Sequence, residues 1–458
     1  MKNRTIISGG FWKKARPWHI VLFCLVVRLS VFLPAWLMSE TPAVFTRSDT
    51  PPYLALAKQL LFSHSFSNAH SPEVFRTPAY PVFLIPGLLS SHVEITTILI
   101  QILLSALTVY LVFKSALIIF EDKAVAAASA FLYASEPLSV VYSLILLTET
   151  LFTFTLMCFL FLAIKLIKNP TAGYALAAGL FAAICSYIRP VALYLSIFAV
   201  ILQGIYIVFS KTQKEKKRLI INLALMLFVS LLLTGIWQMR NLKETGYGRF
   251  SSVSDFNLYF YHRVSVMAKN EKLPFYQVQD TEEKIFKRIV AEQGLDYASG
   301  FAYMQRQALK TLSDNVGTFA VIYIKGIAAV LFSPGATEYA ELFSYKGKKD
   351  IFGGTLDLSP VKVLKNAASD APLLFAANVF LGLLLILCYV FMVGGVVNMK
   401  KTDAACIFMF IVLAYFILLS GGVTGYGRFR HPVMPVISIF GGYGLLQIIA
   451  RIRSCPLK

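Results

Sequence analysis

Long apolar runs recur along the whole chain, and they restrict it to folds that a lipid bilayer can surround. The run from Trp18 to Met38 is long enough to cross a membrane, since a spanning helix needs about 20 apolar residues. Nine further runs follow, at about 95–119, 124–143, 147–167, 172–188, 190–210, 218–238, 372–396, 404–421 and 432–450. Of the 458 residues, 57% are hydrophobic, which is far more than in a soluble protein. The sequence therefore predicts an all-α polytopic membrane protein with about ten transmembrane helices.

Lysine and arginine residues predict the orientation of these spans. With ten spans and a cytoplasmic N-terminus, every cytoplasmic segment carries Lys or Arg, as the positive-inside rule requires. The strongest case is the basic run KTQKEKKR at 211–218. An eleventh apolar run at about 317–333 would break this agreement if it spanned, because Arg451 and Arg453 would then lie outside. We therefore expect 317–333 to lie along the outer interface and both termini to be cytoplasmic. The expected location is a bacterial inner membrane, since external glycosylation sequons are sparse.

The formal net charge of +19 would suit a nucleic-acid-binding protein, but these basic residues gather in the predicted cytoplasmic segments and near lipid headgroups. No nucleic acid is expected as a partner. Of six cysteines, all but Cys455 lie in apolar runs, so neither a disulfide nor a metal cluster is predicted. The chain has no glycine-rich phosphate loop, and no cofactor is expected.

The spacing of the apolar runs divides the chain into three parts. Residues 1–240 form a membrane core that includes a first external loop at 39–94, residues 241–371 form an external region with interfacial helices, and residues 372–458 add C-terminal transmembrane helices. Helical patterns within the external region predict short helices there. This region is too short and too interrupted to be a separate catalytic domain.

Acids and arginines collect at the outer ends of the spans. Asp49 follows the first span, Glu149 begins the fourth, and Arg189 occupies the turn between the fifth and the sixth. Further polar residues at the same face are Arg240, Asn241, Arg428 and Arg430. A guanidinium group offers a planar fork of donors to phosphate oxygens, and a carboxylate can accept a proton from an attacking hydroxyl. A reaction on a lipid-linked phosphate needs both.

Each of these residues also has a structural interpretation. An arginine at the end of a span commonly marks the membrane boundary, and Asp49, before Thr-Pro-Pro, is a suitable helix cap. Glu149 is harder to explain in this way, because an acid in the first turn of a span is costly unless it is paired or lines a wet cavity. Tyrosines are interface anchors by default, and the histidines match no metal motif.

Six motifs follow one another along the chain. They are D-x-x-x-Y-x-x-x-A from Asp49, RTPAYPVFL from Arg76, LLTE-LF at 146–152, IRP at 188–190, WQMRN-x-x-x-x-G from Trp237 and GRFRHPVMP from Gly427. Together they resemble the GT-C glycosyltransferases, and within them the branch shared by protein O-mannosyltransferases and the lipid A aminoarabinose transferase. The resemblance covers most of the chain and weakens over about 260–370.

The resemblance implies an enzyme that moves one sugar from a polyprenyl-phosphate carrier to a protein, lipid or glycan acceptor outside the cytoplasm, with inversion and without a metal. Asp49 and Glu149 match its catalytic acids. Arg189, Arg428 and Arg430 match basic positions that would hold the donor phosphate, and Arg76, where the first loop folds back on the membrane, is a fourth candidate for this role. The candidates for other substrate contacts are Tyr53, Tyr80, Arg240, Asn241, Tyr426 and His431. Many relatives have paired acids in the first loop, whereas Ser48 and Thr50 flank a single acid here. The division of labour between the two acids is therefore open.

Two other functions fit the same pattern. Ten spans and basic cavities suit a transporter or flippase of lipids or lipid-linked sugars, although no charged pair is predicted in mid-span and a long first external loop is not needed for transport. A non-catalytic assembly partner that keeps the fold is the second alternative. Substitution of Asp49 distinguishes these functions, because an enzyme loses turnover while still binding lipid.

Overall fold

The computed structural model describes residues 12, 14–68, 71–209, 216–344, 369, 371–399 and 404–454. Within these ranges the chain is almost entirely helical, and its only strands are β1 (Ser67–Asn68) and β2 (Ser71–Pro72), which pair in the first external loop. The predicted all-α class is confirmed. The predicted basic segments at 211–215 and 400–401, and residues 345–368 of the predicted external region, lie outside the described residues.

Each predicted apolar run contains a helix. These helices are α2 (Pro17–Met38), α5 (Val93–Phe120), α6 (Lys123–Ala134), α8 (Glu149–Lys168), α9 (Ala172–Ile188), α10 (Leu195–Phe209), α11 (Lys216–Thr245), α19 (Pro372–Val397), α20 (Ala404–Leu419) and α21 (Met434–Ser454). Six stretches of the described chain are long and apolar enough to cross a membrane: α2, α5, α8, α11, α19, and α21 with the turn before it. The helices α6, α9, α10 and α20 are shorter, so the number of ten crossings remains a prediction.

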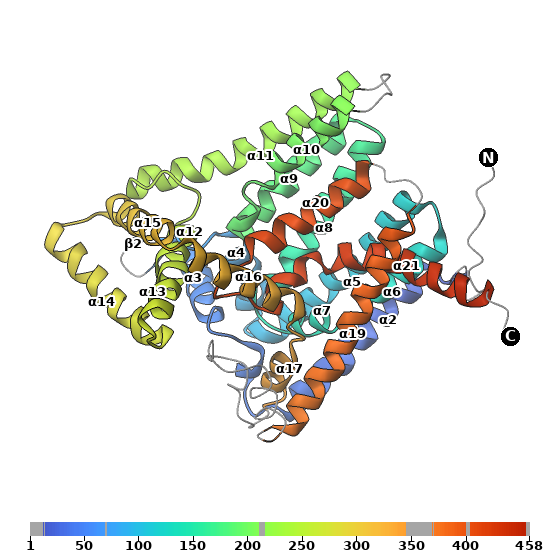
Figure 1. Cartoon of the computed structure of the whole chain (residues 1–458), viewed down its shortest axis with the longest axis horizontal. Helices are drawn as coiled ribbons and strands as arrows, with labels where there is room; N and C mark the ends of the chain where they lie inside the picture. Colours follow the sequence, from blue (N-terminus) through green and yellow to red (C-terminus); the bar gives the residue numbers. More distant parts are fainter. Residues whose placement is uncertain are drawn as a thin grey trace.

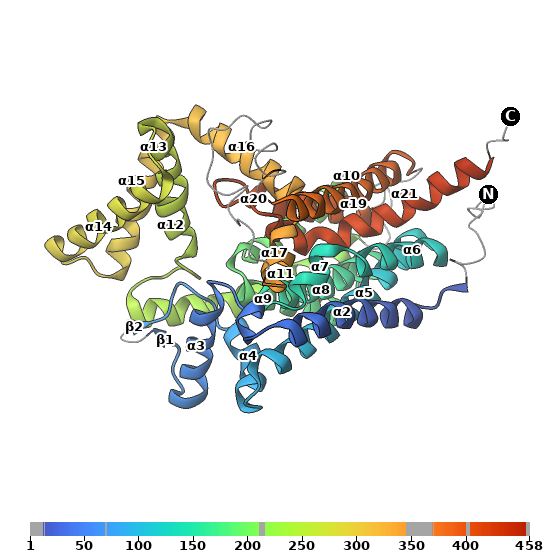
Figure 2. The ribbon, with the colours of Figure 1, turned by 90° about the horizontal axis from the view of Figure 1, so that it is seen from below.

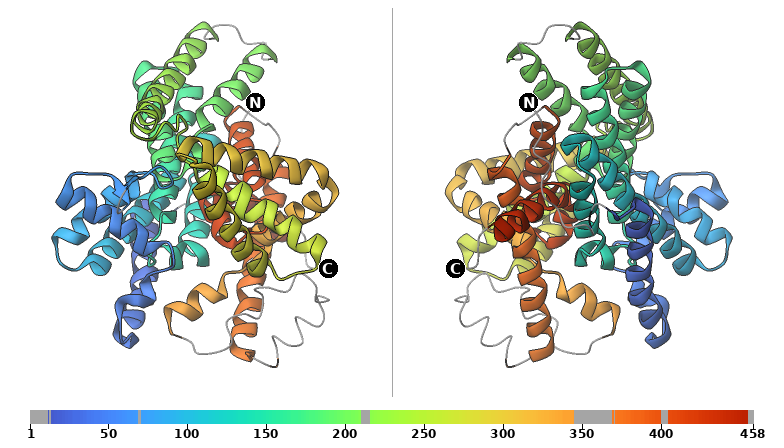
Figure 3. Two further views of the ribbon diagram at one scale, coloured as in Figure 1. Left: turned by 90° about the vertical axis from the view of Figure 1, so that its left-hand side faces the viewer. Right: turned by 90° about the vertical axis from the view of Figure 1, so that its right-hand side faces the viewer.

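The helices form a bundle with a lobe at one end (Figure 1). The outer lobe consists of α12 (Val253–Asn257), the π-helix η3 (Leu258–Arg263), α13 (Val264–Glu271), α14 (Phe275–Gln293) and α15 (Tyr297–Asp314). The start of α2 and the end of α21 lie at the opposite end of the bundle (Figure 2). The helices α3 (Thr50–Ser63) and α4 (Ala79–Leu89) project from one flank, in blue in Figure 3. The backbone of the first loop bonds to the base of the outer lobe.

The predicted span at 124–143 is not a continuous helix, which corrects the sequence interpretation. After α6 ends, the short helix α7 (Pro137–Tyr142) begins, and residues 143–148 then follow without helical structure. Glu136 caps α7 by accepting hydrogen bonds from two backbone N–H groups, and Pro137 has no N–H with which to continue α6. The cap and the proline therefore start a new helix within the apolar run.

Arg28, inside α2, holds this break from the side. Its guanidinium donates hydrogen bonds to the carbonyl oxygen of Ala134 (3.0 Å) and to the hydroxyls of Ser105 (2.8 Å) and Ser139 (3.0 Å). The side chain is completely buried, and it forms no ion pair within the described chain. Hydrogen bonds to neutral oxygen atoms therefore replace the water that this charge gives up.

The irregular segment 143–148 is buried, and several of its backbone groups bond to neighbouring elements. Gln101 donates its side-chain amide to two carbonyl oxygens of the segment, at 2.8 and 3.2 Å. Leu146 donates its N–H to Phe45 of the first loop (2.8 Å), and its carbonyl accepts the hydroxyl of Thr50 (2.8 Å). Non-helical backbone between membrane helices is tolerated when its polar groups are satisfied in this way. The segment thus delivers the first residue of α8 to the first loop.

The apolar run at 317–333 forms α16 (Val316–Phe332), which meets α15 at an angle of 100°. The two helices therefore do not make one straight span. A β-carbon at Gly326 of α16 would overlap the backbone of Gly422, so the helix and the loop before α21 pack without side chains between them. The position of α16 along the outer interface remains a prediction.

Candidate active site

Five of the predicted site residues form one chain of ion pairs at the end of the bundle nearest the outer lobe. Asp49 precedes α3, Arg76 precedes α4, Glu149 begins α8, Arg189 joins α9 to the turn η2 (Pro190–Ala192), and Arg428 lies in the turn η5 (Gly427–Val433). These five residues are called the outer cluster below. The fold therefore brings together side chains that are widely separated in the sequence.

Arg428 is the centre of the outer cluster, because it binds both acids. Its Nη1 atom lies 3.0 Å from Asp49 Oδ2, and its Nε atom lies 2.5 Å from Glu149 Oε1. Arg76 Nη2 contacts the other oxygen of Asp49 at 3.4 Å, and Arg189 Nη1 shares Glu149 Oε1 at 3.0 Å. Three guanidinium groups thus face two carboxylates, which leaves one positive charge in excess.

The two acids differ in their access to solvent. The side chain of Glu149 is 0% exposed, whereas that of Asp49 is 38% exposed. Arg428 and Arg76 are also partly exposed, at 25% and 19%. Asp49 and its two arginines form the open side of the cluster, and Glu149 with Arg189 forms the closed side. An acid buried as deeply as Glu149 is stable only because it is paired.

The side chain of Asp49 makes no capping hydrogen bond, although the residue immediately precedes α3. The interpretation of Asp49 as a helix cap is therefore wrong, and both its oxygens bind arginines instead. Arg76 lies over the rings of Tyr53 (5.0 Å) and Phe75 (5.4 Å), and its Nε atom has no hydrogen-bond partner among the described residues. This arginine thus keeps one donor unused beside Asp49.

Aromatic rings also shield the other arginines. Phe429 lies 5.3 Å from the guanidinium carbon of Arg189 and 5.8 Å from that of Arg428. Such cation–π contacts contribute about 0.5–2 kcal/mol each, more where water is excluded. Burial raises the pKa of the Tyr53 hydroxyl, and the charge of Arg76 opposes this rise. The Tyr53 hydroxyl therefore remains protonated and can donate a hydrogen bond on the open side.

A glycine-rich loop positions Arg428. Gly422 adopts a φ of 106°, which residues with a side chain rarely adopt, and a β-carbon there would overlap the ring of His262 in the outer lobe. The N–H of Gly425 then bonds to the carbonyl of Gly422 at 3.0 Å. The loop is therefore held between the outer lobe and α16 immediately before it delivers Arg428.

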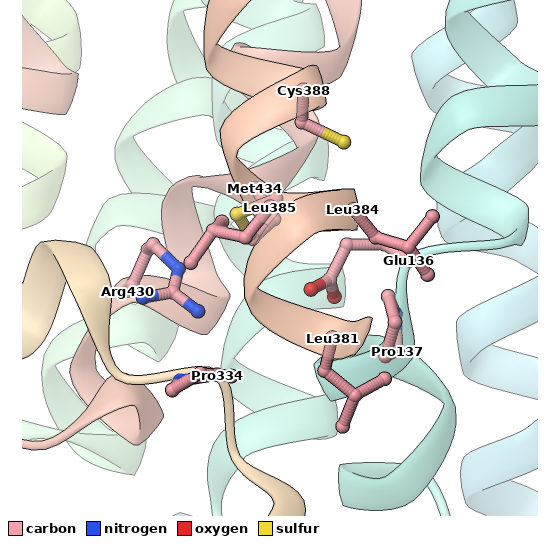
Figure 4. A pocket seen from close by; sticks show the side chains of 9 residues that line it. All are labelled: Glu136, Pro137, Pro334, Leu381, Leu384, Leu385, Cys388, Arg430 and Met434. Atoms are coloured by element: carbon pink, nitrogen blue, oxygen red, sulfur yellow. The ribbon is translucent and has the colours of Figure 1, made fainter. Parts of the chain in front are cut away.

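Arg430, two residues further on, does not join the outer cluster. Its guanidinium donates hydrogen bonds to the carbonyls of Val330 (2.6 Å), Leu331 (2.9 Å) and Ser333 (3.0 Å) at the end of α16. Figure 4 shows Arg430 beside a small pocket along α19, with Glu136 on the opposite side. A cation at a helix C-terminus is favourable, so the geometry assigns Arg430 to holding α16.

Three predicted substrate-binding residues hold the first loop and the base of the outer lobe. Tyr80 is completely buried, and its hydroxyl donates to Gln101 at 3.3 Å. Arg240 donates to two backbone carbonyls that flank the β1–β2 hairpin, at 2.8 and 2.7 Å. Asn241 is also buried, and its amide donates to the carbonyls of residues 249–250. These contacts fix the first loop and the base of the outer lobe, next to the outer cluster.

The last two predicted residues, Tyr426 and His431, differ in their exposure. Tyr426 is 59% exposed just before η5. His431 is buried, with its Nδ1 atom 3.0 Å from the hydroxyl of Thr153. Of these two residues, only Tyr426 is therefore open to a substrate.

A second group of ion pairs was missed by sequence reasoning. Arg47 binds Glu338 at 3.3 Å and Glu341 at 2.8 Å, both on α17 (Ala336–Leu342), and Glu338 also accepts the hydroxyl of Tyr142 at 3.0 Å. Two acids three residues apart were a visible signal, but the sequence does not indicate a partner 291 residues away. In the described part of the chain, no three His, Cys, Asp or Glu side chains gather to form a metal site.

Comparison with known proteins agrees with this architecture. Residues 82–237, about a third of the chain, match the family model described as dolichyl-phosphate-mannose-protein mannosyltransferase. A search of the curated proteins finds no significant match.

Solved structures of the Archaeoglobus fulgidus oligosaccharyltransferase share the fold. The apo form has a TM-score of 0.57 at 14% identity, over 97% of this chain and 52% of that one. AglB in complex with an inhibitory peptide and a dolichol-phosphate has a TM-score of 0.55 at 13% identity, over 97% and 51%. ArnT from Cupriavidus metallidurans, bound to undecaprenyl phosphate, aligns with a TM-score of 0.42 at 12% identity, over 95% and 78%.

The chain spans about half the length of the archaeal oligosaccharyltransferase. Its apolar helices, the family match and the shared fold all agree with the resemblance that the six motifs indicate. The family match also supports the predicted enzyme class. The resemblance is therefore confirmed: this multi-pass membrane protein has the fold of the GT-C glycosyltransferases.

Proposed function

We propose that the chain transfers a single sugar from a polyprenyl-phosphate carrier to an acceptor at the outer face of the membrane, with inversion at the anomeric carbon. The observation that carries this proposal is the outer cluster, in which three arginines from separate elements converge on two acids of unequal exposure. The family match, and the dolichol-phosphate in the complex of the similar AglB, support a lipid-phosphate donor.

The arginines would hold the phosphate of the donor. Arg76 and Arg428 are partly exposed where they bind Asp49, so phosphate oxygens can reach the same donors. As the bond between sugar and phosphate breaks, negative charge builds on the leaving phosphate. Guanidinium groups fixed in a partly dry site stabilise that charge without reorganisation. This positive charge is the basis for proposing a reaction that requires no metal.

The unequal burial of the acids supports a division of labour. Glu149 is enclosed and binds Arg189 and Arg428, so it would position the arginines. Asp49 is the accessible acid. When the donor phosphate takes its place on Arg76 and Arg428, Asp49 becomes free to accept the proton of the attacking hydroxyl or amine. Donor binding would thereby prepare the base.

The orientation remains part of the proposal. The residues just before Arg76 bond to the base of the outer lobe, and α3 and α4, which follow Asp49 and Arg76, lie on the side of the bundle that carries this lobe (Figure 1). Arg451 and Arg453, in the last turn of α21, lie at the other end and suit a cytoplasmic surface. The active site would accordingly face the periplasm of a bacterial inner membrane.

The test is single-turnover transfer from radiolabelled polyprenyl-phosphate sugars, with released polyprenyl phosphate as the readout. Wild type in nanodiscs should release the carrier only when an acceptor extract is present. Asp49→Asn should lower the rate by about 10²–10⁴-fold, because a positioned base contributes that much, while donor binding is retained.

Asp280→Asn is the matched control, since this acid is exposed on α14 in the outer lobe, outside the cluster. The control should behave as wild type. Release by Asp49→Asn at the wild-type rate would remove Asp49 from the proposal. Lipid binding without release in wild type, across the panel of sugars, would replace transfer by lipid translocation.

A further inference from the structure

A continuous row of aromatic rings leads from the outer cluster to the surface of the outer lobe. Phe75, whose ring lies against Arg76, contacts Phe256 edge-on at 5.2 Å between ring centres. Phe256 in turn contacts Tyr261 at 6.1 Å, Tyr261 stacks on Phe275 at 6.2 Å, and Phe275 contacts Tyr276 at 5.5 Å. These five rings are called the aromatic strip. The first four are half-buried, and Tyr276 is 71% exposed.

Tyr261 connects the strip to the proposed base. It lies in the π-helix η3, a rare conformation that is frequent at functional sites. Burial raises the pKa of Tyr261, and the neighbouring charge of Asp49 raises it further. Tyr276 and the exposed Tyr426 are also close enough to Tyr261 to interact with it electrostatically. Tyr426 thus lies near the strip. Burial also raises the pKa of Tyr426, so the hydroxyls of Tyr261 and Tyr426 remain available as neutral donors.

We propose that the aromatic strip binds a neutral carbohydrate chain and guides its hydroxyl to Asp49, so that the acceptor of the reaction is a glycan. This inference rests on the proposed function and names its acceptor class. The C–H face of a sugar ring packs on an aromatic ring, and phenol hydroxyls at the ring edges bond to sugar hydroxyls. The five side chains of the strip are themselves uncharged, which suits an uncharged ligand of repeated rings.

Two other acceptors fit the strip less well. A peptide that docks as a strand needs an exposed sheet edge, and the described chain offers only the two-residue strands β1 and β2, which pair with each other. A lipid acceptor would approach between membrane helices, whereas η3 and α14 belong to the outer lobe (Figure 2). The surface position of Tyr276 therefore favours a water-soluble chain.

Binding is measured first, by saturation-transfer NMR on the full chain in nanodiscs. The probes are mannotriose, maltotriose and N-acetylchitotriose, with a serine- and threonine-rich peptide as the competing class. At least one trisaccharide should bind wild type and Asp49→Asn alike. Tyr276→Ala should weaken this binding about three- to tenfold, as expected for one aromatic contact, and Tyr276→Phe should retain most of it.

Tyr297→Ala is the matched control, because Tyr297 is an exposed tyrosine of the outer lobe that is not part of the strip. Absence of trisaccharide binding in wild type, equal binding by Tyr276→Ala, or binding of the peptide alone would each overturn the proposal. Trisaccharide binding through Tyr276 in a protein that transfers nothing would keep the strip and remove the proposed function.

A transfer assay then separates binding from chemistry. With a water-soluble cell-envelope glycan fraction as acceptor, Tyr276→Ala and Tyr261→Leu should raise the acceptor KM about three- to tenfold. Donor binding should not change in either variant. An unchanged acceptor KM in both variants would overturn the proposal even where wild type is active.

Discussion

Arg28 is completely buried and Arg428 is partly exposed, and their partners differ as well. Arg28 is surrounded by hydroxyl and carbonyl oxygens, which satisfy its donors without neutralising its charge. Arg428 is held by two carboxylates, one enclosed and one exposed to solvent. The first arrangement has no opening through which a ligand can enter. In the second, an incoming anion can take the place of Asp49.

The difference separates a structural arginine from a functional one. The neutral partners of Arg28 are themselves buried, which suits a residue that closes the break between α6 and α7. A chain of alternating charges can be rearranged by a ligand that carries charge of its own. The two sites should therefore respond differently to substitution, one in stability and the other in catalysis.

The largest expected effect is on stability, at Arg28. Arg28→Met keeps much of the volume but leaves the carbonyl of Ala134 and two serine hydroxyls without a donor. Because each hydrogen bond to a charged group contributes about 1.5–3 kcal/mol, the free energy of unfolding should fall by about 3 kcal/mol or more. Denaturant unfolding in detergent measures this loss, and Arg306→Met, at an exposed arginine on α15, should leave stability unchanged.

Arg428→Met should reverse this pattern. The rate of sugar transfer should fall about 10²–10³-fold, the usual cost of removing one donor that stabilises transition-state charge. Stability should fall less than in Arg28→Met, because Glu149 retains Arg189 and Asp49 retains solvent. Single-turnover transfer and unfolding are compared on the same samples. Equal losses of stability in the two variants, with transfer intact in Arg428→Met, would abolish the distinction between the sites.

The sequence predicted the membrane class, the positions of the helices and the presence of acids and arginines at one face. These features depend on composition and on local order, which apolar runs record directly. The pairing of Asp49 with Arg428 spans 379 residues, and no local pattern encodes it. The exposure of one acid and the burial of the other likewise depend on packing alone.

Arg428 and Arg430 illustrate this limit most clearly. The sequence gives no reason to treat two arginines in one short motif differently. In the structure they lie in a 3₁₀ turn, where three residues complete a revolution, so side chains two residues apart point in different directions. One reaches the outer cluster, and the other reaches the end of α16. The break after α6 could have been predicted, because Glu136 and Pro137 form a recognisable helix start. The apolar composition of the run led to the prediction of one continuous span instead.

Glu149→Gln sharpens the contrast within the outer cluster itself. The amide keeps the shape of the carboxylate but removes the charge that holds Arg189 and Arg428. If Glu149 positions these arginines, transfer should fall about 10–100-fold, the equivalent of one charged hydrogen bond, and donor KM should rise with it. Glu149→Gln with a larger loss than Asp49→Asn, at unchanged donor KM, would instead identify Glu149 as the base.

The smallest expected effect concerns His262, a half-buried side chain in the outer lobe. Its ring lies against the loop that carries Arg428, its Nδ1 atom has no hydrogen-bond partner among the described residues, and burial lowers its pKa from the usual value near 6.5. As pH falls through 6.5, the unfolded chain binds a proton that the folded chain resists. Folding is therefore disfavoured below this pH, by at most about 1.4 kcal/mol between pH 7.5 and 5.5.

His262→Gln removes this linkage, so its loss of stability between pH 7.5 and 5.5 should be smaller than that of wild type. Other groups titrate over the same range in both proteins, and the difference between the two isolates His262. Thermal unfolding in detergent at the two pH values measures it. An identical pH dependence in both proteins would mean that His262 is protonated in place. The charged imidazolium would then need a hydrogen-bond acceptor at the loop, just as Arg28 has oxygen acceptors around it.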